Sequence, residues 1–193
     1  MEDVGAVNSL EQGSALVAAP GLQDPNFRRT VVLIIDHGAS GTLGVVLNRP
    51  SEVPVHDVLP LWGPHVTVPR ALYVGGPVQR RAALCVAALP AGVDAERTEG
   101  MIKVRGSLAL IDLEADPELI APQLRGLRVF AGYAGWGAGQ LTGEISRGDW
   151  VVVPALADDV LAPPNTDLWS RILRRQGMPL ALLATYPSDP VEN

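Results

Sequence analysis

The sequence is poor in cysteine and aromatic residues and has no long apolar run. Cys85 is the only cysteine among 193 residues, so neither an internal disulfide nor a cysteine cage for a metal can form. It lies in the apolar run AALCVAAL, which predicts a buried, unreactive thiol. The acidic start, MEDVGAV, lacks the basic and apolar regions of a signal peptide, and no apolar run approaches the ~18–20 residues that cross a bilayer. We therefore expect a cytoplasmic protein that does not bind a membrane.

Positive charge is scarce and scattered. Acidic residues outnumber basic ones by 21 to 15, which gives a net charge of −6. Such a field repels phosphate backbones and anionic lipids, so binding to either would require a separate basic patch. The basic pairs at residues 28–29, 80–81 and 174–175 are spread along the chain, and we expect them on solvated faces. Direct nucleic-acid binding is therefore disfavoured.

Familiar catalytic signatures are absent as well. The chain has no GxxxxGK[ST], HExxH, GxSxG or CxxC motif, each of which indicates a defined chemistry. Its three histidines, His37, His56 and His65, are not at the spacing of helical metal ligands. The sequence thus predicts no metal site and no cofactor, and it assigns no catalytic residue.

Aliphatic residues dominate what is present: 47% of the chain is hydrophobic but only 5% is aromatic. A chain of this length buries enough surface to form one domain without disulfides. We predict a flexible segment at residues 1–12, a single domain at 13–187 and a tail at 188–193.

Apolar and β-branched runs bounded by turn residues predict strands. These runs are residues 14–19, 30–35, 43–47, 71–74, 83–89, 101–104, 107–111, 127–131 and 150–153. Helices are expected at 55–59, 117–124, 139–148 and 167–176, while 180–184 fits either a strand or a helix. Asp116 and Asp167 are typical N-caps. Because strands come in consecutive groups with helices inserted late, we predict an α+β fold, a mixed and largely antiparallel sheet with a few short helices packed on it.

A glycine-rich segment, GYAGWGAGQLTGE, follows the strand predicted at 127–131. It does not fit the dinucleotide pattern G-x-G-x-x-G, because Thr142 occupies the position of the last glycine. Backbone N–H groups that follow glycines at a helix start can still hold an anion. The alternative is that the glycines let Tyr133 and Trp136 pack against a close backbone, and this interpretation is favoured.

Three other polar turns end apolar strands: DPNFRRT at 24–30, LNRP at 47–50 and GGP at 75–77. Asp24, Asn26 and Asn48 suit side-chain hydrogen bonds that stabilise turns. Arg29 and Arg49 add cationic forks near the strand ends, as a carboxylate or phosphate site would need. The residue types therefore fit both a structural and a binding role.

At these residues the chain resembles the AlgH/YqgE family of small bacterial proteins. The resemblance rests on DPNFRRTVVLIIDH, GVVLNRP, YVGGPV and GYAGWGAGQLTGEI, with support from WVVVPA and DLWSRIL, and it covers about residues 13–186. It implies a compact α+β domain of the bacterial cytoplasm with no established enzymatic activity. Some members are described as transcriptional regulators, on the basis of effects on polysaccharide production and not of a DNA-binding element. The segment 90–126 matches little of the family pattern.

Carried onto this chain, the family motifs fall on Phe27 and on residues that we take as candidates for binding. These candidates are Asp24, Asn26, Arg29, Thr30, His37, Asn48, Arg49, Gly75, Gly76, Tyr133, Trp136, Gln140 and Glu144. The first hypothesis is a non-enzymatic binding or regulatory module, whose motif loops converge on one polar cleft for a small anionic molecule or a peptide. The second is an undiscovered hydrolase or transferase that uses Glu144, His37 or Asp24 as a general base in that cleft. The third is a regulator of transcription that acts indirectly; the sequence leaves the oligomeric state open.

Overall fold

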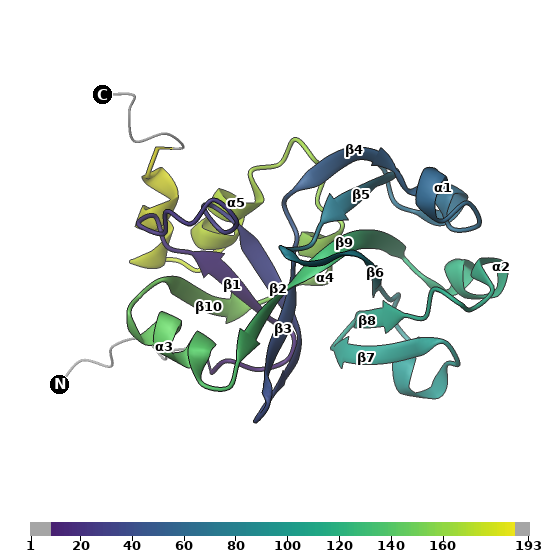
Figure 1. Cartoon of the computed structure of the whole chain (residues 1–193), viewed down its shortest axis with the longest axis horizontal. Coiled ribbons are helices and arrows are strands. Elements are labelled where there is room, and N and C mark those ends of the chain that lie inside the picture. Colours follow the sequence, from purple (N-terminus) through teal and green to yellow (C-terminus); the bar gives the residue numbers. More distant parts are fainter. Residues whose placement is uncertain (1–8, 188–193) are drawn as a thin grey trace.

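Ten strands form one curled sheet in the computed structural model, which describes residues 9–187 (Figure 1). The strands are β1 (Ser14–Ala18), β2 (Val31–Gly38), β3 (Gly41–Val46), β4 (Pro50–Pro54), β5 (Ala71–Val74), β6 (Val78–Ala88), β7 (Met101–Arg105), β8 (Leu108–Ile111), β9 (Gly126–Gly137) and β10 (Trp150–Pro154). Their main order is β10-β1-β2-β3-β9-β6-β8-β7, and β5 joins β4 to β9. The β5–β9 pairing is parallel and the other pairings are antiparallel, which confirms the predicted α+β class.

Short helices connect and cover the strands. The α-helices are α1 (Val55–Val58), α2 (Pro117–Ile120), α3 (Gln140–Ser146), α4 (Ala157–Val160) and α5 (Leu168–Arg175). The 3-10 helices are η1 (Gly63–His65), η2 (Ala95–Arg97), η3 (Ala121–Gln123) and η4 (Leu180–Thr185). Asp116 and Asp167 cap α2 and α5 by accepting from backbone N–H groups, as predicted. Within residues 9–187, none of the helices has both the length and the apolar character needed to cross a membrane.

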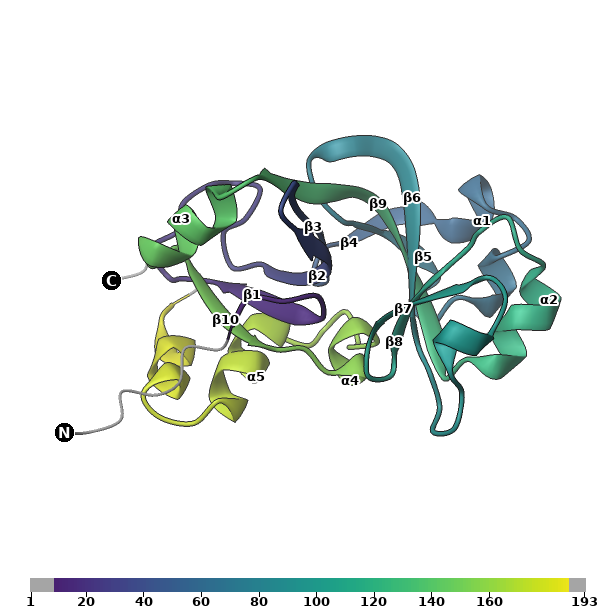
Figure 2. The same cartoon turned by 90° about the horizontal axis from the view of Figure 1, so that it is seen from below.

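The central strands are buried on both faces, which explains their continuous apolar sequence. Every residue of β1 is buried, as are the first five residues of β2. One face of these strands packs against α4 and α5 through side chains such as Val160, Trp169 and Ile172. The opposite face packs against α3 through Leu141, so helices cover both faces of this part of the sheet (Figure 2). A separate apolar cluster lies under β6, β8 and β9 and includes the buried thiol of Cys85.

β9 is longer than predicted, because the glycine-rich segment continues the strand to Gly137. In that segment Gly132, Ala134 and Trp136 are buried, while the residues between them are more exposed. This alternation has the period of two that a strand requires. The expectation that a loop begins after residue 131 was therefore wrong. The small residues of this segment therefore indicate a strand whose backbone lies close to its neighbours, and not a turn.

The basic pairs at residues 28–29 and 174–175 each contain an arginine that is held by contacts inside the protein. The expectation that all basic pairs lie on solvated faces was therefore wrong. The guanidinium of Arg29 lies 4.1 Å from the ring centroid of Trp169. Arg175 donates to both carboxylate oxygens of Asp159, which is fully buried, at 2.6 Å each. A buried carboxylate requires such a partner. These arginines consequently hold the fold together.

The proposed domain limits fall close to the ends of the described chain. Residues 1–8 of the predicted flexible segment and residues 188–193 of the predicted tail lie outside the described residues. Within the described part, the Gln12 side chain donates to the carbonyl of Ile35 at 3.0 Å. Strand β1 begins two residues later, at Ser14.

Glycines allow the backbones of β5, β6 and β9 to approach closely where these strands cross. A Cβ atom on Gly75 would lie 2.3 Å from the carbonyl oxygen of Gly132, and one on Gly76 would lie 2.2 Å from the carbonyl of Tyr133. Gly132 itself has a φ of +73°, and its Cβ would lie 2.7 Å from the carbonyl oxygen of Gly76. Backbone atoms cannot move aside as side chains do. We call this contact of Gly75, Gly76 and Gly132 the glycine crossing.

The substitution Gly132→Ala tests the glycine crossing. We expect it to lower the free energy of unfolding by about 2–4 kcal/mol, because it adds both left-handed backbone strain and overpacking. Urea denaturation measures the change. Gly137→Ala, in the same strand with open space around its Cβ, should change stability by less than about 0.5 kcal/mol. Equal effects of the two substitutions would refute the role of the crossing.

Candidate functional site

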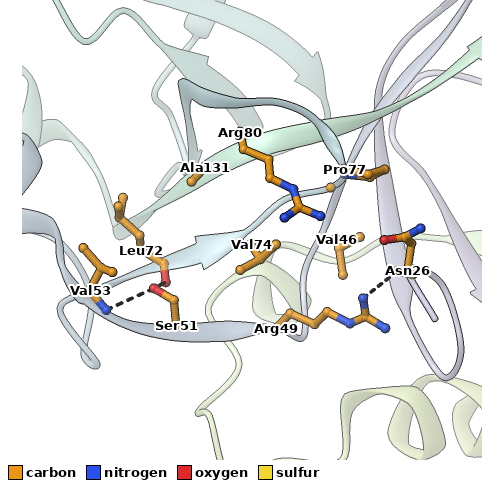
Figure 3. A pocket seen from close by; sticks show the side chains of 11 residues that line it. Asn26, Val46, Arg49, Ser51, Val53, Leu72, Val74, Pro77, Arg80 and Ala131 are labelled. Carbon is orange, nitrogen blue, oxygen red and sulfur yellow. Dashed lines mark hydrogen bonds between the residues drawn. The ribbon is translucent and has the colours of Figure 1, made fainter.

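A pocket of about 380 Å³ lies between the β4–β5 hairpin, β6 and the turn that follows β1 (Figure 3). Its lining residues are Asn26, Val46, Arg49, Ser51, Val53, Leu72, Val74, Gly76, Pro77, Arg80 and Ala131. Apolar side chains form most of this surface, and two arginines approach it from different elements. Pockets of this kind, apolar with few polar groups, are typical of small-molecule sites.

Arg80 reaches the pocket from a bulge in β6. Val78 pairs with Tyr133 and Ala83 pairs with Ala131, so residues 79–82 lie opposite Gly132 alone. Gln79, at the start of the bulge, has a φ of 43°, a conformation that non-glycine residues seldom adopt. The Arg80 side chain points from this bulge into the pocket (Figure 3). Strained backbone of this kind is more common at functional sites than elsewhere.

Arg49 borders the pocket from the turn between β3 and β4. Its guanidinium donates to the carbonyls of Asn26 at 2.6 Å, Pro25 at 2.9 Å and Arg28 at 3.4 Å. Burial lowers the pKa of Arg49 from its ordinary value, and the negative charge of Asp24 partly offsets this effect. No ion pair in the described part of the chain includes Arg49. It is thus a cation that is held in place by neutral groups.

Only some of the predicted site residues meet at this pocket. Asn26, Arg49 and Gly76 line it, Gly75 is next to it at the glycine crossing, and Asp24 acts on Arg49 through its charge. Arg80 was missed by the sequence analysis. The available signal was the charged pair at residues 80–81, which interrupts an otherwise strand-like run directly after GGPV.

Another group of predicted residues forms an aromatic cluster around Glu144. Its Oε2 accepts from the indole N–H groups of Trp136 and Trp150, each at 2.9 Å. Its Oε1 accepts from the side chain of Gln140 at 3.2 Å, and Gln140 accepts from the N–H of Gly137 at 3.1 Å. Phe27 stacks on Trp136, with ring centroids 5.9 Å apart. These contacts fasten α3 and the turn after β1 to the sheet.

A third group of predicted residues anchors the turn after β1 to α5. None of these residues lines the pocket. Arg29, whose φ is 52°, donates to Asp167 at 3.2 Å, to Ser170 at 3.4 Å and to the carbonyl of Tyr186 at 3.1 Å. The Asn48 side chain accepts from Val31 N–H and donates to the carbonyl of Arg29. Thr30 is fully buried and donates to the carbonyl of Phe27.

The remaining predicted residues lie elsewhere on the sheet. His37, near the end of β2, shares a 2.7 Å hydrogen bond with the hydroxyl of Thr42 in β3. Tyr133 is half-buried and packs against the central core. The three candidate general bases thus belong to different elements, and none of them lines the pocket. Among residues 9–187, no three His, Cys, Asp or Glu side chains gather where they could hold a metal ion.

Comparison with known proteins places this arrangement among related structures. The chain matches the model of a family described as AlgH-like over residues 15–181. It is 55% identical over 181 residues to the UPF0301 protein of Rhodococcus opacus, covering 94% of this chain and 90% of that protein. The crystal structure of a Corynebacterium diphtheriae protein is similar with a TM-score of 0.90 and 45% identity, covering 96% of this chain and 95% of that one. The solution structure of the AlgH protein from Pseudomonas aeruginosa has a TM-score of 0.66 and 29% identity, covering 97% and 98% of the two chains.

The substitution Glu144→Gln tests the aromatic cluster. A glutamine has one acceptor oxygen and an NH₂ group, so it must place a donor against either the two indoles or Gln140. We expect a loss of about 1–3 kcal/mol in the free energy of unfolding, measured by urea denaturation followed by tryptophan fluorescence. Thr142→Ala, at an exposed position of α3, is the matched control. If Glu144→Gln lowered the free energy of unfolding no more than this control does, the hydrogen bonds of Glu144 would not be what holds the aromatic cluster together.

The ion pair of Arg29 with Asp167 predicts a pH dependence. Burial alone would raise the pKa of Asp167, but hydrogen bonds from Ser170 and the charge of Arg29 lower it overall from its ordinary value of 3.8. Because the folded pKa is below the unfolded one, the carboxylate adds stability above the unfolded pKa and loses this contribution as the pH falls through the folded pKa.

Asp167→Asn should therefore lower Tm most near neutral pH, and the difference from the unmutated protein should disappear in strong acid. Thermal unfolding followed by circular dichroism across this range measures both proteins. A difference that is constant with pH would show that the charge of Asp167 does not contribute.

Proposed function

This chain belongs to the AlgH-like family, and we propose that it is a non-enzymatic binding module whose pocket takes a small anionic molecule. The observation that carries the proposal is that Arg49 and Arg80 both line one largely apolar pocket. Guanidinium groups bind carboxylates and phosphates through directed, charge-assisted hydrogen bonds. The carboxylate end of a peptide has the same chemistry.

The two arginines have different parts in this proposal. Arg49 is already bound by three carbonyls, so it contributes a fixed positive charge at the edge of the pocket. Arg80 has no carboxylate partner among residues 9–187 and extends into the pocket (Figure 3). We therefore assign the direct contact with the anion to Arg80.

The apolar surface selects for the rest of the ligand. Val46, Leu72, Val74 and Ala131 lie beside the two arginines, and Val53 is exposed at the rim with 46% of its surface accessible. Burying an apolar group here is favourable by roughly 25 cal/mol per Å². An anion with an aliphatic or aromatic body therefore fits better than a bare inorganic ion.

The pocket favours binding over proton transfer. No acidic residue or histidine is among the described residues that line it. Glu144, His37 and Asp24 each engage other protein groups. The hydrolase or transferase hypothesis thus gains no specific support from the site.

A regulatory role would follow from ligand binding and not from DNA contact. The net charge of −6 opposes binding to phosphate backbones. In α5, Arg175 is engaged by the buried Asp159, so this basic helix has less free charge than its sequence indicates.

A thermal-shift screen of amphipathic carboxylates and phosphates tests the proposal. We expect at least one compound to stabilise the unmutated protein saturably, and Arg80→Met to weaken its Kd roughly 10-fold to 100-fold, the effect of losing one charge-assisted hydrogen bond. Arg81→Met, in the same bulge but outside the pocket lining, should leave the Kd unchanged. If no compound stabilises the unmutated protein, or if both variants bind equally well, the small-anion proposal fails.

A further inference from the structure

The pocket between Arg49 and Arg80 is elongated along β5. Its floor follows this strand and the residues after it, from Leu72 through Val74 to Gly76, a length of about 13 Å at ~3.3 Å per residue. The N–H of Val74 donates to the carbonyl of Arg49 at 2.8 Å, which places Arg49 beside the later half of the floor. The floor is therefore long enough for an extended ligand.

The other end of the pocket is apolar. Pro54 of β4 pairs with Ala71 of β5. Val53 therefore lies beside the start of β5, close to Leu72. Figure 3 shows Val53 and Leu72 together at one end of the pocket and Arg49 at the opposite end. Because Val53 is exposed, the apolar end is open to solvent.

Arg80 directs its charge toward the polar end. In Figure 3 its side chain extends from β6 toward Pro77 and away from Val53 and Leu72. Arg49 lies at the same end, where it donates to carbonyls of the turn after β1. The two cations thus share one end of the pocket, and apolar side chains form the other.

The charge at the polar end matches one carboxylate better than a dianion. The negative charge of Asp24 lies close enough to Arg49 to offset part of the effect of burial on its pKa, so the cationic excess is less than two full charges. The Nη groups of Arg49 already donate to three carbonyls, which leaves Arg80 as the main donor to a ligand. A single guanidinium matches a carboxylate through two parallel hydrogen bonds.

The apolar part of the pocket offers no free hydrogen-bonding side chain among the described residues that line it. Ser51 is the polar residue there, and its hydroxyl donates to the carbonyl of Leu72 at 2.7 Å and accepts from the N–H of Val53 at 3.2 Å. A peptide would bring a backbone N–H and C=O with each residue, and each would need a partner. The described lining also contains no aromatic ring on which a planar ligand could stack. A plain hydrocarbon chain needs neither.

We propose that the ligand of this pocket is a straight-chain aliphatic carboxylate, with its carboxylate at Arg80 and its chain along β5 toward Val53. This inference rests on the proposed function, since it names the class of anion that the pocket takes. An extended chain advances about 1.2 Å per bond, because three backbone bonds span at most ~3.6 Å. About ten carbons therefore fill the floor, and a longer chain emerges past Val53 into solvent.

Isothermal titration calorimetry of the full chain tests the proposal, with unbranched carboxylates from butanoate to tetradecanoate, each below the concentration at which it forms micelles. The Kd should fall about 3-fold to 4-fold for each added methylene and level off after about ten carbons. Arg80→Met should raise the Kd of every member by a similar factor. Val53→Thr, which keeps the β-branched shape, should make the gain from hexanoate to decanoate several-fold smaller. Val58→Thr, exposed in α1 and outside the pocket lining, should leave this gain unchanged.

The contrary outcomes separate this inference from the proposed function. If compact aromatic carboxylates bind through Arg80 but chain length has no effect, the proposed function stands and the inference fails. If no anion binds, both fail. Tighter binding of decyl phosphate, or of a peptide with an apolar carboxy-terminal residue, than of decanoate would assign the pocket to another ligand. Affinity that keeps rising to tetradecanoate, or that Arg80→Met leaves unchanged, would show nonspecific association with apolar surface and overturn the inference.

Discussion

The glycine crossing is the contact on which the rest of the candidate site depends. Gly75, Gly76 and Gly132 let three backbones meet at distances that no side chain permits. This close approach leaves room for residues 79–82 to pass over Gly132, and Arg80 points from there into the pocket. The same parallel pairing of β5 with β9 places Leu72 and Val74 on the pocket side and Tyr73 on the other. The packing of these backbones thus determines which side chains lie on each face of β5.

Most of the polar motif residues maintain the turn after β1, and their contribution to the pocket is indirect. Glu144 and Trp136 hold this turn from one side through Phe27, and Arg29 holds it from the other through α5. Fixed in this way, the turn offers its carbonyls to Arg49. The hydrogen bonds of Arg49 go to neutral carbonyls, and Asp24 supplies the nearby negative charge. The turn therefore fixes the Arg49 guanidinium at the edge of the pocket.

Local sequence predicted the elements whose pattern is local. The runs at 14–19 and 30–35 are apolar after their first residue because both faces of β1 and of the first part of β2 are buried, and the caps Asp116 and Asp167 act within one helical turn. The features that were missed depend on pairing between distant strands. Glycine normally ends a strand, so nothing in GYAGWG showed that β9 would continue beside β3. Likewise, the charged pair at residues 80–81 marks an interruption of the strand, but where Arg80 points follows only from the bulge in β6.

The proposed function requires that the pocket between Arg49 and Arg80 receives the anionic end of an amphipathic ligand. A crystal structure of the protein bound to the compound that stabilises it most tests this claim directly. We expect the anionic group within hydrogen-bond distance of the Arg80 guanidinium, with the apolar body of the ligand against Val74 and Ala131. A ligand seated away from these residues, for example against Glu144 and the two tryptophans that donate to it, would contradict this expectation.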